Sequence, residues 1–316
     1  MDRDALTPAQ LRVVDELMAL GQERPVFERD LAVRLRDQLE AGLAPAAEKL
    51  APEELPWVNK DRLAKVHACE AHFLAETDFE WTARTARGSV VHKALELSVT
   101  LGDDAVPLEL VDHAIETLKD DDRRASPGPW LADAPPLEVA ELRSSANDVV
   151  AKFFECWPPL QAKWIPRTET GIGVPLLDEK VMLWAKVDLL LGKPQGQQAR
   201  TLVVDFKTRG KYARHLDDLR FYALVQAVRL GVPPFRVASY YLDTADFHVE
   251  DVDEDVLQST VRRVIAGVTK MIELRAGTRE PTITEGPQCS WCQLRDTCEG
   301  AVRWRARALD DGDEPI

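Results

Sequence analysis

Two acidic residues and a lysine stand in apolar segments, where burying a charge is costly unless the charge is used. Three apolar residues lead into Asp205-Phe206-Lys207, and Asp188 lies among the apolar residues of Trp184–Leu191. In a strand, alternate side chains share a face, so Asp205 and Lys207 would point the same way. Carboxylates brought together from neighbouring strands repel each other, and a divalent cation relieves that repulsion. These residues predict a divalent-cation site beside an amine.

A histidine upstream could complete this set of ligands. His92 and Glu96 are four residues apart in the segment Gly88–Glu96, so on a helix they would share a face. A neutral imidazole is a ligand for Mn²⁺ and similar ions. A single helical histidine is more often a core or surface residue, so His92 is a candidate only in combination with the two acidic segments. One cation or two are both compatible with these residues.

Three cysteines near the end of the chain form a second group. Cys289, Cys292 and Cys298 give the spacing C-x2-C-x5-C, which is typical of a metal or cluster site. The fourth ligand would be Cys69 or Cys156. Zinc and iron–sulfur clusters both accept four thiolates, so the residues alone allow either. Disulfides are not expected, because the chain reads as cytoplasmic.

The elements that must position these residues change type along the chain. Helical periodicity gives way to strand patterns near residue 164, which predicts an α/β domain with a large helical N-terminal portion. Pro25 is interpreted as a helix start, Gly88-Ser89 as a turn and N-cap, and residues 43–56 and 121–136 as connections. The predicted helices are 7–20, 26–42, 60–76, 89–101, 108–120, 137–156, 215–230 and 253–276, and the predicted strands are 164–174, 181–191, 201–207 and 236–242.

Composition is that of an ordinary globular protein. The chain has 316 residues, 45% hydrophobic and 30% charged. No apolar run is long enough to span a membrane and no signal peptide is visible, so a cytoplasmic enzyme is expected. The net charge of −14 is unusual for a nucleic-acid binder. However, the acid is concentrated in Glu250–Asp255, Asp120–Asp122 and Asp310–Glu314, while Arg209–Arg220 and Arg295–Arg307 are locally basic.

Four segments in order resemble the successive motifs of the RecB-like PD-(D/E)XK exonuclease family. They are Gly88–Glu96, Val187-Asp188, Asp205–Lys207 and the following helix with Tyr222. The resemblance implies a restriction-endonuclease-like core, with a central mixed sheet flanked by helices. It also implies roles for individual residues: His92, Asp188, Asp205 and the Phe206 carbonyl as Mg²⁺ or Mn²⁺ ligands, Lys207 positioning or activating the water, Glu96 supporting the site, and Tyr222 lining the DNA path.

One position departs from the family pattern. Family members usually carry a glutamine four residues before the tyrosine, whereas this chain has Asp218 there and Gln226 four residues after it. The departure puts the substrate contacts of that helix in doubt.

The cysteines resemble those of the iron–sulfur branch of the family, which includes AddB and the CRISPR-associated RecB-like exonucleases. There, one distant upstream cysteine joins a C-terminal C-x2-C-x5-C around a [4Fe–4S] cluster. The resemblance implies that Cys69 completes the set, with zinc as the rival to the cluster. Cys156 is expected to be a buried apolar residue. Three regions follow: a helical extension 1–56, a nuclease domain 57–300 with the cluster, and a basic then acidic tail 301–316.

The expected function is a metal-dependent DNA exonuclease acting on single-stranded ends in repair or recombination. A helicase or another repair protein is the partner that such an enzyme would have, and no membrane is expected. The alternative is a DNA-binding or scaffold subunit on the same fold with little catalysis, which Asp218 and the acidic net charge favour. A third possibility is a hydrolase with a structural zinc site that acts on RNA or nucleotides.

Overall fold

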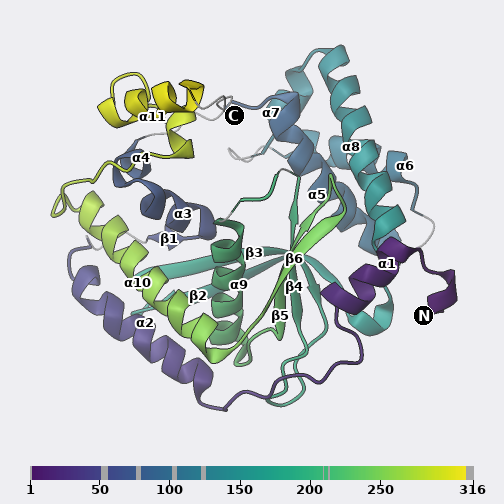
Figure 1. Ribbon diagram of the computed structural model, residues 1–316, viewed down its shortest axis with the longest axis horizontal. Coiled ribbons are helices and arrows are strands. Elements are labelled where there is room, and N and C mark those ends of the chain that lie inside the picture. The colour runs from purple at the N-terminus through teal and green to yellow at the C-terminus, as the bar shows by residue number, and fades with distance from the viewer. Residues whose placement is uncertain are drawn as a thin grey trace.

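A mixed sheet lies at the centre of the computed structural model (Figure 1). The structure describes residues 2–50, 56–75, 80–101, 105–121, 126–208, 210–212 and 214–310. Strand β3 pairs with β2 along its length, with β1 at Met182 and Leu183, and with β4 at Leu189–Leu191. Strand β5 is parallel to β4 and antiparallel to β6. The strands are β1 (Trp57–Val58), β2 (Arg167–Leu176), β3 (Val181–Leu191), β4 (Leu202–Lys207), β5 (Arg236–Tyr241) and β6 (Asp246–Asp251).

Helices cover both faces of the sheet and enclose two hydrophobic cores. The first core contains apolar residues of α2 (Leu31–Ala47), α3 (Lys60–Ala68), α9 (Arg214–Leu230) and α10 (Glu254–Arg275). The second contains residues of η2 (Val13–Leu17), α5 (Ala83–Leu101), α6 (Pro107–Lys119), α7 (Gly128–Asp133) and α8 (Pro136–Cys156). The shorter helices are η1 (Arg3–Ala5), α1 (Pro8–Arg12), α4 (Glu70–Leu74), η4 (Ala162–Trp164), η5 (Pro287–Ser290) and α11 (Glu299–Asp310). The predicted restriction-endonuclease-like α/β fold, a mixed sheet flanked by helices, is confirmed.

Strand β4 alternates as predicted. Val203 belongs to the first core, whereas Leu202, Val204 and Phe206 belong to the second. Asp205 and Lys207 therefore share the face covered by α9, because side chains two residues apart in a strand point the same way.

Two predicted helix starts are wrong. Helix α5 begins at Ala83, so Gly88-Ser89 lies inside it, and the helix start is instead marked by Thr82, whose Oγ1 accepts from the Thr85 N–H (3.3 Å). Helix α2 begins at Leu31 rather than at Pro25. The residues before it are extended, since the Pro25 carbonyl accepts from the Ala199 N–H (2.9 Å) and Val26 forms a bridge with Gln198.

Other predicted boundaries also change. Helix α2 continues to Ala47, into the predicted connection 43–56, of which residues 51–55 lie outside the described residues. The predicted helix 60–76 is broken at Cys69, which has extended dihedral angles (φ −165°, ψ 121°). The predictions missed β1, β6, the short helix α7 within 121–136, and α11.

The three predicted regions stay a prediction, although part of the first shares a core with the second. Leu31, Leu35 and Leu39 of α2 are fully buried in the first core, beside strands of the sheet. Asp122, Arg209 and residues 311–316 of the predicted charged stretches lie outside the described residues. No helix within the described ranges is long and apolar enough to cross a membrane.

Candidate active site

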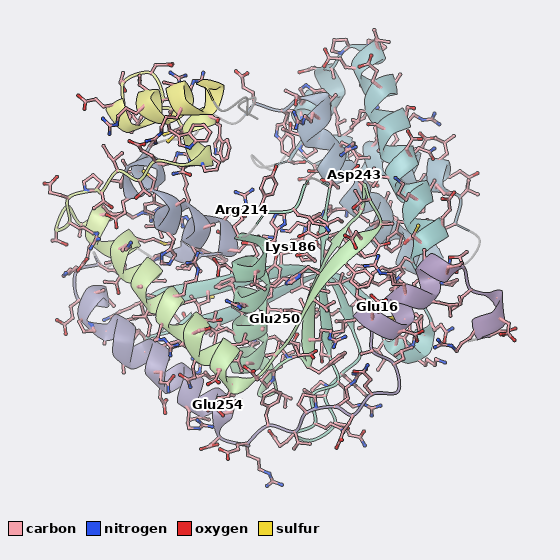
Figure 2. The ribbon with its side chains drawn as sticks, viewed as in Figure 1. Glu16, Lys186, Arg214, Asp243, Glu250 and Glu254 are labelled. Atoms are coloured by element: carbon pink, nitrogen blue, oxygen red, sulfur yellow. The ribbon has the colours of Figure 1, made fainter. Side chains whose placement is uncertain are left out.

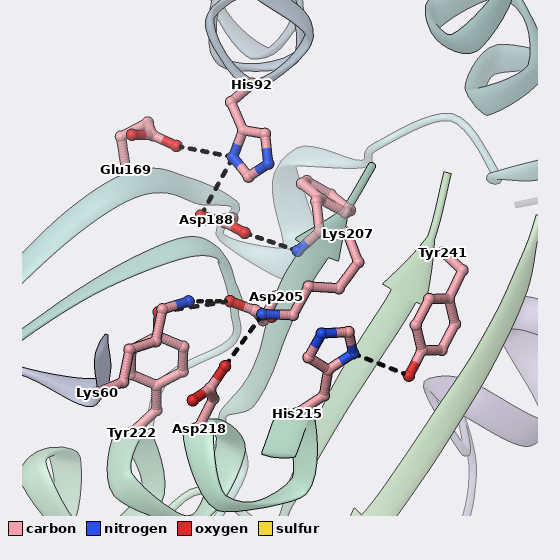
Figure 3. Close-up of polar contacts among 11 residues, drawn as sticks. Lys60, His92, Glu169, Asp188, Asp205, Lys207, His215, Asp218, Tyr222 and Tyr241 are labelled. Atoms are coloured by element: carbon pink, nitrogen blue, oxygen red, sulfur yellow. Dashed lines mark hydrogen bonds and ion pairs between the residues drawn. The ribbon is translucent and has the colours of Figure 1, made fainter. Parts of the chain in front are cut away.

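A histidine and two carboxylates meet where α5 faces strands β2 and β3. His92 Nδ1 lies 3.3 Å from Asp188 Oδ1 and 3.8 Å from Glu169 Oε1 (Figure 3). One ligand atom from each of the three residues lies within 4.8 Å of the others. This spacing and this choice of donors suit a divalent cation such as Mn²⁺ or Mg²⁺. We call His92, Glu169 and Asp188 the acidic triad.

Glu169 was not predicted from the sequence, and its backbone explains how it reaches the site. Thr168 pairs with Leu189 and Thr170 with Val187, so Glu169 stands opposite Asp188 across the β2–β3 ladder. Its φ of 48° is left-handed, which is unfavourable for a residue other than glycine. Such strain persists where the surroundings enforce it, often at functional sites.

Protonation of His92 competes with cation binding at the triad. Burial lowers the pKa of His92, but the charges of Asp188 and Glu169 outweigh burial and raise the pKa to about 10. A cation bound by the same carboxylates would displace that proton, since an imidazole must be neutral to act as a ligand.

Glu169→Gln is expected to weaken Mn²⁺ binding by about 10- to 100-fold, because the amide keeps the shape of the side chain but removes a charge facing the cation. Calorimetric titration of the metal-free protein measures the affinity. Glu179→Gln is the matched control, since Glu179 is exposed in the turn that joins the same two strands. Equal affinities for Glu169→Gln and the wild type would remove Glu169 from the site.

Asp205 anchors a second cluster, composed of buried charges. Its carboxylate is almost fully buried and lies 2.9 Å from Lys60 Nζ and 2.6 Å from Lys207 Nζ. The Tyr222 hydroxyl donates to the same carboxylate (3.4 Å). Burial alone would raise the pKa of Asp205, but Lys60 and Lys207 outweigh it and hold the pKa well below its usual range. Asp205 is therefore a carboxylate held between two ammonium groups.

The departure from the family pattern lies inside this cluster. Asp218 Oδ2 is 3.2 Å from Lys207 Nζ, so a carboxylate contacts the amine at the position where the family carries a glutamine. Burial raises the pKa of Asp218, while the charges of Lys207 and Lys60 oppose that change. Lys207 thus has two acidic partners.

Asp188 connects the triad to the Asp205 cluster. The Phe206 N–H donates to Asp188 Oδ2 (2.6 Å), just beyond the point where the β3–β4 pairing ends at Leu189 and Val204. The side chain of Asp188 thereby takes the place of a backbone acceptor. The structure brings together His92, Asp188 and the segment 205–207, although Asp205 does not join the triad itself.

The remaining predicted residues lie as follows. Glu96 Oε2 pairs with Lys93 Nζ (2.5 Å) on the same helix. Tyr222 is buried, and its hydroxyl contacts Asp205, so a role in lining the DNA path stays a prediction. Lys60 was missed. It is the first residue of α3, after the N-cap Asn59, and only the tertiary position of that helix end brings it to Asp205.

Comparison with known proteins agrees with this geometry. The family model described as the PD-(D/E)XK nuclease superfamily matches residues 59–299. The chain belongs to the PD-(D/E)XK nuclease superfamily. The resemblance inferred from the motifs is thereby confirmed at the level of this superfamily, whose members generally use divalent metal ions. A search of curated proteins gave no match.

A search of solved structures found matches at low similarity. A "Putative exonuclease" from Eubacterium rectale has 13% sequence identity and a TM-score of 0.46, over 78% of this chain and 87% of that one. The structure of SSO0001 has 13% identity and a TM-score of 0.31, over 85% of this chain and 97% of that one.

Four of the five cysteines of this nuclease-superfamily chain form a separate group. Cys69 lies at the break between α3 and α4, and its Sγ accepts from the Thr284 N–H (3.5 Å). Burial raises the pKa of Cys289, and the neighbouring thiols of the other three cysteines, Cys69, Cys298 and Cys292, raise it further. Cys156 lies elsewhere, at the end of α8 and close to Tyr240. The structure thus brings Cys69, and not Cys156, to the C-terminal three.

Proposed function

We propose that this chain is a metal-dependent exonuclease that hydrolyses DNA, acting on single-stranded ends in repair or recombination. Membership of the nuclease superfamily supports a nuclease. The observation that carries the proposal is the hydrogen bond from the Phe206 N–H to Asp188, since it ties the acidic triad to the backbone of the segment Asp205–Lys207.

The residues divide the chemistry between them. A bound Mg²⁺ or Mn²⁺ would lower the pKa of a water and offset charge on the phosphate. His92, Glu169 and Asp188 would hold that cation. Lys207 offers an ammonium group that can donate to the attacking water or to a phosphoryl oxygen. Lys60 keeps Asp205 ionised, and Asp205 orients Lys207 through an ion pair.

The test is digestion of labelled DNA by anaerobically purified protein, with Mn²⁺, with Mg²⁺ and with EDTA. We expect mononucleotides or short products from single-stranded DNA with either cation, and none with EDTA until excess cation is returned. Cleavage restricted to RNA would favour the third possibility named from the sequence. A lack of cleavage of every substrate would favour a subunit that binds DNA without cutting it.

That second candidate function, a catalytically weak DNA-binding subunit, has one observation in its favour. Asp218 adds a carboxylate to Lys207, which would occupy an amine needed for chemistry. Asp218→Gln restores the family residue and separates the two accounts. An active wild type that keeps its rate in Asp218→Gln supports the exonuclease, whereas an inactive wild type that gains cleavage in Asp218→Gln supports the binding subunit.

We also infer that Cys69, Cys289, Cys292 and Cys298 hold a [4Fe–4S] cluster. The thiols of Cys69, Cys292 and Cys298 are near enough to raise the pKa of Cys289, and Cys69, Cys289 and Cys292 are buried. Four thiolates can hold either zinc or an iron–sulfur cluster, so metal analysis of the purified protein decides between the two.

A buried ion pair supports the inferred cluster from beside it. Arg279 donates to both carboxylate oxygens of Glu70 (2.8 and 3.0 Å), and the Thr282 N–H donates to the same group (3.1 Å). These bonds hold the segment after α10 against the start of α4. Figure 1 shows the result, with α11 beside α4 although the two are far apart in the sequence. A helicase partner stays a prediction from the resemblance.

A further inference from the structure

One half of strand β3 presents a face that the helices leave uncovered. Leu183, Ala185 and Val187 point into the first core, whereas only Leu189 and Leu191 of this strand belong to the second. Trp184, Lys186 and Asp188 alternate with the buried residues and so share the opposite face. Trp184 and Lys186 are both exposed on it. Lys186 is labelled near the middle of Figure 2.

Two tryptophans form an exposed aromatic surface on this face. The rings of Trp57, on β1, and Trp184 are 5.6 Å apart, tilted by 58°. Trp57 is 48% exposed and Trp184 is 37% exposed. Side chains this large and apolar are usually covered, and exposed groups of them often mark binding sites. We call Trp57 and Trp184 the tryptophan platform.

Two glycines fix the position of the Trp184 ring. A Cβ at Gly171 would lie 2.9 Å from ring atoms of Trp184, and one at Gly173 would lie 3.3 Å from the ring. The indole therefore rests on the bare backbone of β2, and a side chain at Gly171 would push it away. The backbone of β2 thus fixes one side of the ring, and Trp57 lies beside it.

The platform leads toward the acidic triad along a single strand. Asp188 is four positions after Trp184, which corresponds to about 13 Å at 3.3 Å per residue. Lys186 stands between them and pairs with Glu169 of the triad. Arg62 adds a second cation, because its guanidinium donates to the Trp57 carbonyl (2.5 Å). Aromatic rings that can stack on bases therefore lie beside cations that can bind phosphates.

We propose that the tryptophan platform stacks unpaired bases of single-stranded DNA and guides the strand to the acidic triad. The proposal rests on the proposed function and names how its substrate is bound. Stacking on aromatic side chains tolerates any base, because every base has a flat face. In a duplex those faces are already stacked, so the platform favours single strands.

The test measures binding and catalysis separately. Without metal, Trp184→Ala and Trp57→Ala should each weaken binding of a single-stranded oligothymidylate by about 5- to 100-fold, with less effect on a blunt duplex. Trp57→Phe should bind like the wild type. Leu137→Ala, at an exposed site on α8, is the control. With Mn²⁺, all variants should hydrolyse bis(p-nitrophenyl) phosphate equally, because this small diester does not reach the platform.

Other outcomes would overturn the proposal. If Trp184→Ala lowers the melting temperature but both alanine variants bind single strands as tightly as the wild type, the tryptophans only cover the glycines. If duplex and single-stranded binding fall equally, the platform does not select unpaired bases. Failure of the wild type to hydrolyse even the small diester would count against the proposed function, while the metal-free binding experiment would still decide the role of the platform.

Discussion

Lys207→Ala should lower Mn²⁺-dependent DNA cleavage by about 10²- to 10³-fold or more, since it removes the ammonium group that Asp205 and Asp218 hold at the end of β4. Asp205→Asn should reduce the rate to a similar extent, because the neutral amide no longer orients Lys207 or balances Lys60. Initial rates on a labelled single strand at saturating Mn²⁺ measure both effects.

The two substitutions have a structural control. Replacing Asp205 leaves two buried ammonium groups with less counter-charge, and an uncompensated buried charge costs about 3–5 kcal/mol. Melting temperatures and circular dichroism therefore accompany each rate. Lys49→Ala is the matched lysine, because Lys49, in the turn after α2, forms an exposed pair with Glu273 of α10. Wild-type rates in folded Lys207→Ala and Asp205→Asn would show that the cleavage site lies elsewhere.

Cys69→Ser should abolish the visible absorption of the inferred cluster and lower the melting temperature by about 10 °C. The cluster would close a loop of about two hundred residues, and cross-links across long loops stabilise by several kcal/mol. Absorption spectra with iron and zinc analysis of the anaerobic protein, followed by thermal melting, give the result.

Cys156→Ser is the matched control, since Cys156 lies beside Tyr240 and away from the other four cysteines. It should keep both colour and melting temperature. Cys69→Ser should also reduce cleavage, because α3 carries Cys69 just after its last residue and Lys60 at its first. Unchanged absorption in Cys69→Ser, or its loss in Cys156→Ser, would contradict the inferred ligands, and a stoichiometric zinc content without iron would replace the cluster with zinc.

The parts of the fold that the sequence predicted well are those whose signal is local. Strand β3 has the predicted bounds and β4 differs by one residue, because period-two apolar patterns reflect burial on a sheet directly. Two predicted helix boundaries were wrong because contacts with residues far away in the sequence set them. Extended residues before α2 are held by a distant bridge to Gln198, and the break at Cys69 coincides with a hydrogen bond from Thr284.

The candidate site divides in the same way. Asp188, Asp205 and Lys207 stood out because charges in apolar strands are costly. Glu169 did not, because it lies in a polar stretch of β2 and meets Asp188 only through the strand register and a left-handed φ. Lys60 reaches Asp205 through the packing of α3, which no local pattern shows.

The central claim is that His92, Glu169 and Asp188 bind a divalent cation beside Lys207. Titration of metal-free protein with Mn²⁺, followed by electron paramagnetic resonance, tests it most directly in the wild type and in Asp188→Asn, because Asp188 contacts both His92 and the Phe206 N–H. We expect the wild type to bind Mn²⁺ and Asp188→Asn to lose about 10- to 100-fold or more in affinity. Equal binding by the two proteins, or no binding by the wild type, would contradict this account of the site.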